Sequence, residues 1–511
     1  MTSPFDPHQV PNPAPTPVPH QHPTPASPWG PSWGATPTGI PAGGQIPGQA
    51  PFPAPISAPP KPKRSNAGLY TAIIVLTVAL IGAVGVAVWQ WPDSSGATPV
   101  DTPTQSVSPT ASTSTQSSPP PATADGTWAV GLCGSKWDLF NDVVVTGLGL
   151  IMAIGNTGSF DGDFEGLIDK SELKGGTAGV IAMFSTEGEF LSMKVYPNQA
   201  FYTAALAKDG SVMVGGASLK NAQPDIAEIT QFNSDGSFRQ KVTFLYDEEL
   251  RMKRITKIKV RSDDYVYAYG ECVQDCTFLT QYSFDYDSQP TAKFDFLTVH
   301  DFDIAPDGSA YLVGTTETED DDVVAVALKL SARGEIIWQK LLYAYGDWTF
   351  RSVAFNKSKI VIVGETTMSM QKDPDPPSGD LNALLLELDS TTGKPGMTKT
   401  YGGSANTLFT AVKVASDGSY IVTGSTQSKD GHFPALYGGG SKGYDAFVAE
   451  ISSNGTPKWH EVFGGSDIDQ LHSLDFADKG IVAAGFYHST NGNLPRSCGD
   501  GDPLLVFVPR T

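Results

Sequence analysis

A repeated phrase near the C-terminus constrains the fold of this chain more than any other feature. Residues 401–404 read Tyr-Gly-Gly-Ser, and they are followed by an apolar run at 420–424, a Lys-Asp-Gly turn at 429–431 and a second apolar run at 445–449. Residues 463–466 restart the phrase as Phe-Gly-Gly-Ser. Because a repeat of this length cannot bury its own apolar strands, it must pack against copies of itself.

Seven short apolar runs that end in glycine extend the repeat along the chain. They lie at 150–155, 212–215, 265–270, 310–314, 360–364, 420–424 and 481–485. Asp-Gly, which is typical of a tight β-hairpin, precedes several of them. Continuous rather than alternating apolar runs indicate strands covered on both faces, as between stacked blades. Dividing residues 127–511 by seven gives 55 residues for each blade, enough for four strands and their loops. The sequence therefore predicts an all-β, seven-bladed β-propeller over residues 127–511.

The tryptophans indicate how the ring closes. Trp338 and Trp459 each open a strand after a glycine-containing turn, but no such strand follows the last apolar run at 504–508. Trp128 heads an equivalent strand at the start of the domain. We therefore expect the strand at Trp128 to complete the last blade, which leaves no exposed sheet edge.

The four cysteines fit the same closure. Cys133 stands where other copies of the phrase have glycine, and Cys498 lies in the loop between the second and third strands of the last blade. Those two loops emerge on one face, so we predict a Cys133–Cys498 disulfide and a local Cys272–Cys276 disulfide. Four free thiols are the alternative.

The N-terminal quarter differs in composition from the repeats. Residues 1–66 are Pro-rich and almost uncharged, which predicts a disordered tail. Residues 67–91 contain an uncharged apolar stretch long enough to cross roughly 30 Å of hydrocarbon, which predicts one transmembrane helix. A secretory signal peptide is the alternative, but such a peptide is shorter and lies closer to the N-terminus. Residues 92–126 are rich in Ser, Thr and Pro and predict an extended stalk.

The charges predict the orientation in the membrane. Lys61, Lys63 and Arg64 precede the apolar stretch, so this flank should stay cytoplasmic. We therefore expect a single-pass plasma membrane protein whose C-terminal domain lies outside. Residues 93–511 hold 31 basic and 53 acidic residues, a net charge of −22. That balance argues against nucleic acid as a partner.

The repeat also resembles a known group. The order Gly-Gly-Ser, Asp-Gly, apolar strand, Asp-Ala-Phe-Val-Ala and Trp is similar to the bacterial β-propeller repeats of secreted proteins and lipoproteins, closely over residues 397–511 and weakly over 191–396. The resemblance implies a propeller fold and a location in the cell envelope. It implies no single function.

One acidic segment has the spacing of a calcium loop. Acids occupy positions 1, 3, 5, 9 and 12 of twelve residues, with glycine at position 6: Asp161, Asp163, Glu165, Asp169 and Glu172. This pattern predicts a calcium site. The alternative is that the segment is only the turn of the repeat, because Asp430 and Asn491 also precede glycine at the matching place.

Three other sequence features give weaker indications of a functional site. Trp137 and Trp348 follow the positions of the Gly-Gly-Ser turn and could form a binding face for sugars or peptides, or could pack between blades. The glycine-rich run 438–443 precedes a strand, where a phosphate-binding loop or nucleophile elbow would precede a helix. The histidines lack the spacing of metal ligands.

Three functions fit these features. The first is a non-catalytic binding or sensing propeller at the envelope that recognises an extracellular protein or glycan. The second is an envelope hydrolase or lyase whose site is assembled from several blades. The third is a structural part of an envelope complex. In each case the Pro-rich tail could bind a cytoplasmic partner that recognises polyproline.

Overall fold

The computed structural model describes most of the C-terminal three quarters of the chain. It covers residues 125–510, apart from 174–175, 220–224, 245–251, 273–275, 284–285, 296, 319–322, 343–347, 368–376, 437–442 and 496. The predicted tail, the predicted transmembrane helix and nearly all of the predicted stalk therefore lie outside the described residues. Within the described ranges, no helix is long and apolar enough to cross a membrane.

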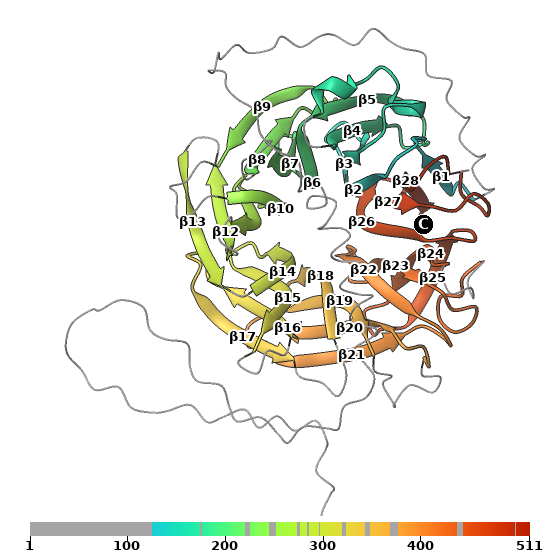
Figure 1. Ribbon diagram of the computed structural model, residues 1–511. Coiled ribbons are helices and arrows are strands. Elements are labelled where there is room, and N and C mark those ends of the chain that lie inside the picture. The colour runs from blue at the N-terminus through green and yellow to red at the C-terminus, as the bar shows by residue number, and fades with distance from the viewer. Residues whose placement is uncertain are drawn as a thin grey trace, which may run out of the picture. The chain divides into compact units, whose positions relative to one another are not determined.

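Seven antiparallel sheets of four strands surround a central axis, which confirms the predicted seven-bladed β-propeller (Figure 1). Blade 1 comprises β2 (Asp138–Val145), β3 (Ile151–Thr157), β4 (Ala178–Phe184) and β5 (Phe190–Pro197). Blade 2 comprises β6 (Gln199–Leu206), β7 (Val212–Ser218), β8 (Ile226–Phe232) and β9 (Phe238–Thr243). Blade 3 comprises β10 (Met252–Val260), β11 (Val266–Cys272), β12 (Cys276–Ser283) and β13 (Tyr286–Asp295). Blade 4 comprises β14 (Leu297–Ile304), β15 (Ala310–Glu317), β16 (Val323–Leu330) and β17 (Ile336–Leu342).

The remaining blades follow the same order from the axis outward. Blade 5 comprises β18 (Trp348–Asn356), β19 (Lys359–Thr366), β20 (Asn382–Asp389) and β21 (Pro395–Tyr401). Blade 6 comprises β22 (Thr407–Val414), β23 (Tyr420–Thr426), β24 (Asp445–Ile451) and β25 (Pro457–Phe463). Blade 7 comprises β26 (Asp469–Ala477), β27 (Gly480–Tyr487), β28 (Asp502–Pro509) and β1 (Trp128–Gly131). The helical elements of the described residues are two 3-10 turns, η1 (Gly162–Phe164) and η2 (Lys170–Glu172), in the loop that follows β3.

The N-terminal strand closes the ring, as the tryptophan pattern predicts. β1 pairs antiparallel with β28, and Trp128 lies opposite Phe507. The two rings stack with their centroids 5.6 Å apart. Because β1 completes the last sheet, blade 7 has its full set of four strands.

The continuous apolar runs are explained by the packing of each blade between two neighbours. On β19, Ile360 and Ile362 pack toward blade 4, whereas Val361 and Val363 pack toward blade 6. All four side chains are fully buried. Successive side chains of a strand point to opposite faces, so a strand with two apolar neighbours needs apolar residues at every position.

A β-bulge in every inner strand explains why the apolar runs end in glycine. In each blade, the register between the innermost strand and the second strand slips by one residue. The glycine opposite the slip leaves no room for a Cβ, which would overlap a backbone carbonyl oxygen of the inner strand at all seven positions: Gly155, Gly216, Gly270, Gly314, Gly364, Gly424 and Gly485. In the second run this glycine is Gly216, one residue beyond the Gly215 at which the sequence pattern ended the run.

We expect Gly364→Ala to lower the free energy of unfolding by roughly 2–4 kcal/mol, because the new methyl group would strike the carbonyl oxygen of Thr349. Gly396→Ala is the matched control, since a Cβ there meets only ordinary van der Waals contacts. Thermal and urea unfolding of the full-length protein measures both changes. Equal effects of the two substitutions would contradict the steric explanation.

Candidate functional site

The Gly-Gly-Ser phrase connects consecutive blades and is held by hydrogen bonds to a second loop, an arrangement that we call a brace. It forms the connection from the outer strand of one blade to the inner strand of the next, and the loop after the second strand of that next blade holds it. In three copies the backbone N–H of the serine donates to a side-chain oxygen of that loop: Ser135 to Asp161 (2.9 Å), Ser404 to Asp430 (2.7 Å) and Ser466 to Asn491 (2.9 Å). The next backbone N–H donates to a serine hydroxyl: Lys136 to Ser159 (2.8 Å), Ala405 to Ser428 (2.7 Å) and Asp467 to Ser489 (3.0 Å).

The structure directs three of the five carboxylates of the predicted calcium loop, those of Asp161, Asp163 and Asp169, to separate partners. Asp163 accepts from the backbone N–H of Cys133 at 2.7 Å, as the Asn493 side chain does from Gly464. Asp169 accepts from the backbone and hydroxyl of Ser171, and Glu165 is exposed. Glu172 contacts Asn198 through its backbone carbonyl. Within the described parts of the chain, no three His, Cys, Asp or Glu side chains are grouped to hold a metal ion. Calcium binding by this loop therefore stays a prediction.

The brace and the calcium site predict different outcomes for Asp161→Asn. Asn491 makes the same hydrogen bond in blade 7, so a brace should tolerate the amide, and we expect the free energy of unfolding to change by less than about 0.5 kcal/mol. The melting temperature of the full-length protein, measured in millimolar calcium and in chelator, tests both interpretations. A calcium-dependent stabilisation that Asp161→Asn removes would establish the metal site.

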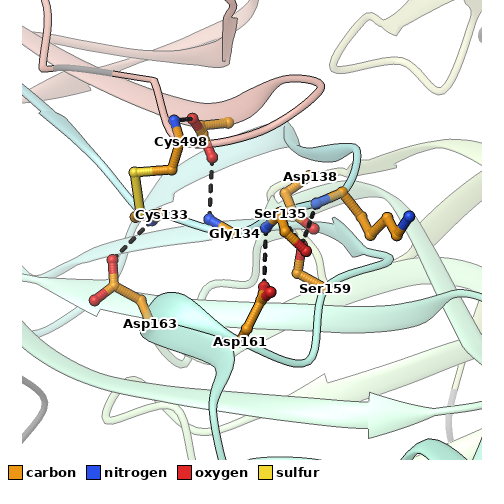
Figure 2. The surroundings of a disulfide bond; sticks show 10 residues. Cys133, Gly134, Ser135, Asp138, Ser159, Asp161, Asp163 and Cys498 are labelled. Carbon is orange, nitrogen blue, oxygen red and sulfur yellow. Dashed lines mark hydrogen bonds between the residues drawn. A yellow bond between two sulfur atoms is a disulfide. The ribbon is translucent and has the colours of Figure 1, made fainter.

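A disulfide clasps the ring where its two ends meet (Figure 2). Cys133 and Cys498 are bonded with their Cα atoms 5.5 Å apart, across 365 residues of sequence. Asp502 supports the clasp, because its carboxylate accepts from the backbone N–H groups of Gly134 (3.1 Å) and Cys498 (2.7 Å). In the chain-entropy model, a cross-link over so long a loop stabilises the fold by roughly 6 kcal/mol. Cys272 and Cys276 form the second disulfide, so both predicted pairs are present.

The two tryptophans of the predicted binding face are half-buried. The Trp137 ring lies 5.0 Å from the Phe486 ring and 4.9 Å from the His488 ring, so it packs at the junction of blades 7 and 1. Trp348 contacts Phe350 within its own strand at 6.0 Å. A ligand-binding role for these two residues stays a prediction.

Two carboxylates at the starts of inner strands, one in blade 1 and one in blade 7, are buried in a way that raises their pKa. Burial raises the pKa of Asp138 to about 6 and that of Asp469 to about 7, against the lowering effect of their hydrogen bonds. Asp469 accepts from the hydroxyl and backbone of Ser489 and from the backbone of Gly465. These acids therefore hold the connecting loops and resist ionisation.

The raised pKa of Asp469 predicts a pH dependence of stability. Its pKa is higher in the folded state than in the unfolded chain, so its contribution is complete below pH 4 and is lost as the pH rises toward 7. We expect Asp469→Asn to flatten the change in the free energy of unfolding between pH 5 and pH 8. Asp500→Asn, at an exposed position, is the control. Parallel pH profiles of wild type and Asp469→Asn would refute this role.

The seven bulges create a ring of polar side chains around the axis. The first residue of several bulge pairs donates to a carbonyl oxygen of the next blade: Asn141 to Phe201 (2.7 Å), His300 to Phe350 (2.6 Å) and Thr410 to Leu471 (2.6 Å). The second residue of several pairs accepts a backbone N–H from the next blade: Asp142 from Ala204 (2.8 Å), Thr203 from Ile258 (3.2 Å), Asp301 from Val353 (3.1 Å) and Ser352 from Val412 (3.3 Å). Neighbouring blades are thus joined at the axis by directional contacts.

A second polar tier lies two residues further along the inner strands. Asp303 accepts from the backbone of Phe355 at 2.7 Å, and Asp475 accepts from that of Val145 at 2.8 Å. Lys259 lies among these acids, with its ammonium 3.9 Å from the Asp301 carboxylate. Burial alone would lower the pKa of Lys259, but the surrounding carboxylates outweigh burial and raise it.

Comparison with known proteins adds little. No protein-family model matches the chain, and no curated protein sequence is significantly similar to it. Among solved structures, a protein of unknown function from Bacteroides caccae is 13% identical with a TM-score of 0.31, covering 53% of this chain and 93% of its own. The structure of the Dos1 propeller is 10% identical with a TM-score of 0.39, covering 74% of this chain and 96% of its own. Likenesses this weak support no conclusion, so the propeller assignment rests on the seven blades themselves.

Proposed function

We propose that this protein is a non-catalytic binding or sensing module at the cell envelope. In this proposal, one transmembrane helix at 67–91 anchors the chain, the Pro-rich tail is cytoplasmic and the propeller lies outside. The two disulfides support an oxidising location. An extracellular protein or glycan is the proposed ligand.

The hydrogen bonding of the axial acids is the observation that favours binding over catalysis. Asp142 and Asp301 each accept from two or more donors, and these include backbone N–H groups of the next blade. A general acid or base must exchange its proton with a substrate. Carboxylates already held by the ring are poorly suited to that exchange, whereas fixed polar groups around an axis suit recognition.

An exposed apolar rim favours a second candidate, a structural part of an envelope complex. Several large apolar side chains are exposed in, or at the strand ends beside, the turns that join first to second or third to fourth strands, which share one face of the ring: Leu148, Leu191, Leu206, Phe238, Tyr265, Ile336 and Ile337. Exposed apolar groups that gather on one face are typical of protein contacts. A protein partner would cover this rim.

Arrays of envelope glycans and peptides, probed with the full-length protein, test the proposed function. We expect a ligand to be retained and recovered chemically unchanged, as mass spectrometry of the eluted material would show. Recovery of a cleaved ligand would replace the proposal with the envelope enzyme. Capture of an intact protein that Phe238→Ser releases would favour the structural role.

A further inference from the structure

Three polar side chains from consecutive blades occupy the bulge tier on one side of the axis. Lys257 on β10 and Arg351 on β18 flank His300 on β14. His300 and Arg351 are the first residues of their bulge pairs and Lys257 is the second residue of its pair, so all three lie at the bulge of an inner strand. The charges of Arg351 and Lys257 both act on the His300 ring, which places the three groups within electrostatic reach of one another.

Each of the three groups has unused hydrogen-bonding capacity. The Lys257 ammonium forms no hydrogen bond or ion pair with any residue that the structure describes. Arg351 binds the Glu365 carboxylate through Nε and Nη2, which leaves Nη1 without a partner among the described residues. Two cationic donors are therefore available.

His300 offers the complementary group. Its Nδ1 lies 2.6 Å from the carbonyl oxygen of Phe350, and a carbonyl can only accept, so Nδ1 carries the hydrogen. Burial lowers the pKa of His300, which keeps the ring neutral at pH 7. Its Nε2 is then an acceptor, and it has no partner among the described residues.

These groups line a space that water reaches. The Arg351 side chain is 23% accessible. The Lys259 side chain, one tier away, is 32% accessible. Both side chains lie on innermost strands, which border the axis, and Lys257 is half-buried on the same strand as Lys259.

The neighbouring carboxylates are already engaged by other donors. Both oxygens of Asp301 already accept, from its own strand, from Ser352 and from the backbone of Val353. Both oxygens of Glu365 accept from Arg351. The channel therefore has donors to spare on Lys257 and Arg351 and one acceptor to spare on His300.

We propose that the axial channel binds a small oxyanion that carries a hydroxyl group. The anionic oxygens would accept from Lys257 and from Nη1 of Arg351, and the hydroxyl would donate to Nε2 of His300. Inorganic phosphate has both features at neutral pH, and so does a hydroxy acid. Sulfate has the same shape but carries no hydroxyl, which makes it the matched control ligand.

This inference rests on the proposed binding function and names a ligand class for it. Different experimental results would contradict the inference and the proposed function. A macromolecule retained on the arrays could bind the outer surface while the channel holds no oxyanion. Phosphate could equally bind the channel of a propeller with no role at the envelope.

The test is calorimetric titration of the full-length protein with phosphate and with sulfate at pH 7 and constant ionic strength. We expect phosphate to bind at least tenfold more tightly than sulfate, and Lys257→Met to weaken phosphate binding at least tenfold. Lys208→Met, at an exposed turn, should leave the affinity unchanged. In the NMR spectrum of the wild type, phosphate should shift the ring nitrogen resonance of His300 and sulfate should not.

Three outcomes would overturn the proposal. The first is no phosphate binding at millimolar concentration, and the second is equal affinity for phosphate and sulfate. The third is phosphate binding that Lys257→Met leaves intact, which would mean an adventitious ion only. If Lys257→Met does not fold, an unshifted His300 resonance in the phosphate-saturated wild type would overturn the proposal in the same way.

Discussion

The β-bulge on each innermost strand is the constraint on which the rest of the ring depends. It brings a backbone carbonyl of the inner strand so close to the second strand that only glycine fits opposite, and all seven blades have glycine there. It also directs two adjacent polar residues toward the neighbouring blade and the axis instead of one. One local irregularity thus explains both the glycine period of the sequence and the polar lining of the centre.

Polar contacts at the axis and apolar contacts further out hold the blades together by different means. The contacts within the apolar layers are non-directional. Alternate side chains of a strand such as β19 pack against the two neighbouring blades. The axial hydrogen bonds are directional, and each contributes only about 0.5–1.5 kcal/mol net, but leaving a buried partner unsatisfied costs about 1–3 kcal/mol. The apolar layers therefore provide most of the stability, while the axial bonds select one register between blades.

Much of the fold could be predicted from the sequence because its signals are local. Three local patterns predict the seven blades and the closure of the ring. They are glycine after an apolar run, the Asp-Gly turns and the unpaired strand at Trp128, and each involves only a few neighbouring residues. The binding groups could not be found in this way, because Lys257, His300 and Arg351 are 43 and 51 residues apart and only the ring brings them together. A weak signal does exist: these residues lie 13 or 14 positions before the glycine of their blade. Three acids of the predicted calcium loop accept from separate backbone N–H groups in the structure, and calcium binding there stays a prediction.

Blades with a strong sequence repeat and blades with a weak sequence repeat contribute different features to the ring. The blades most alike in sequence, blades 6 and 7 with blade 1, carry the three braces and the disulfide clasp, so repetition there reflects a shared structural task. Blades 3 to 5 fall largely in the segment where the repeat is weakest, and there Lys257, His300 and Arg351 replace the small or neutral residues that blade 6 has at its bulge, Thr410 and Ala411. Residues that hold a blade in place must satisfy the same geometry in every copy, whereas residues that meet a ligand on the axis need not. The departure from the repeat is therefore the part of the sequence where ligand recognition is best sought.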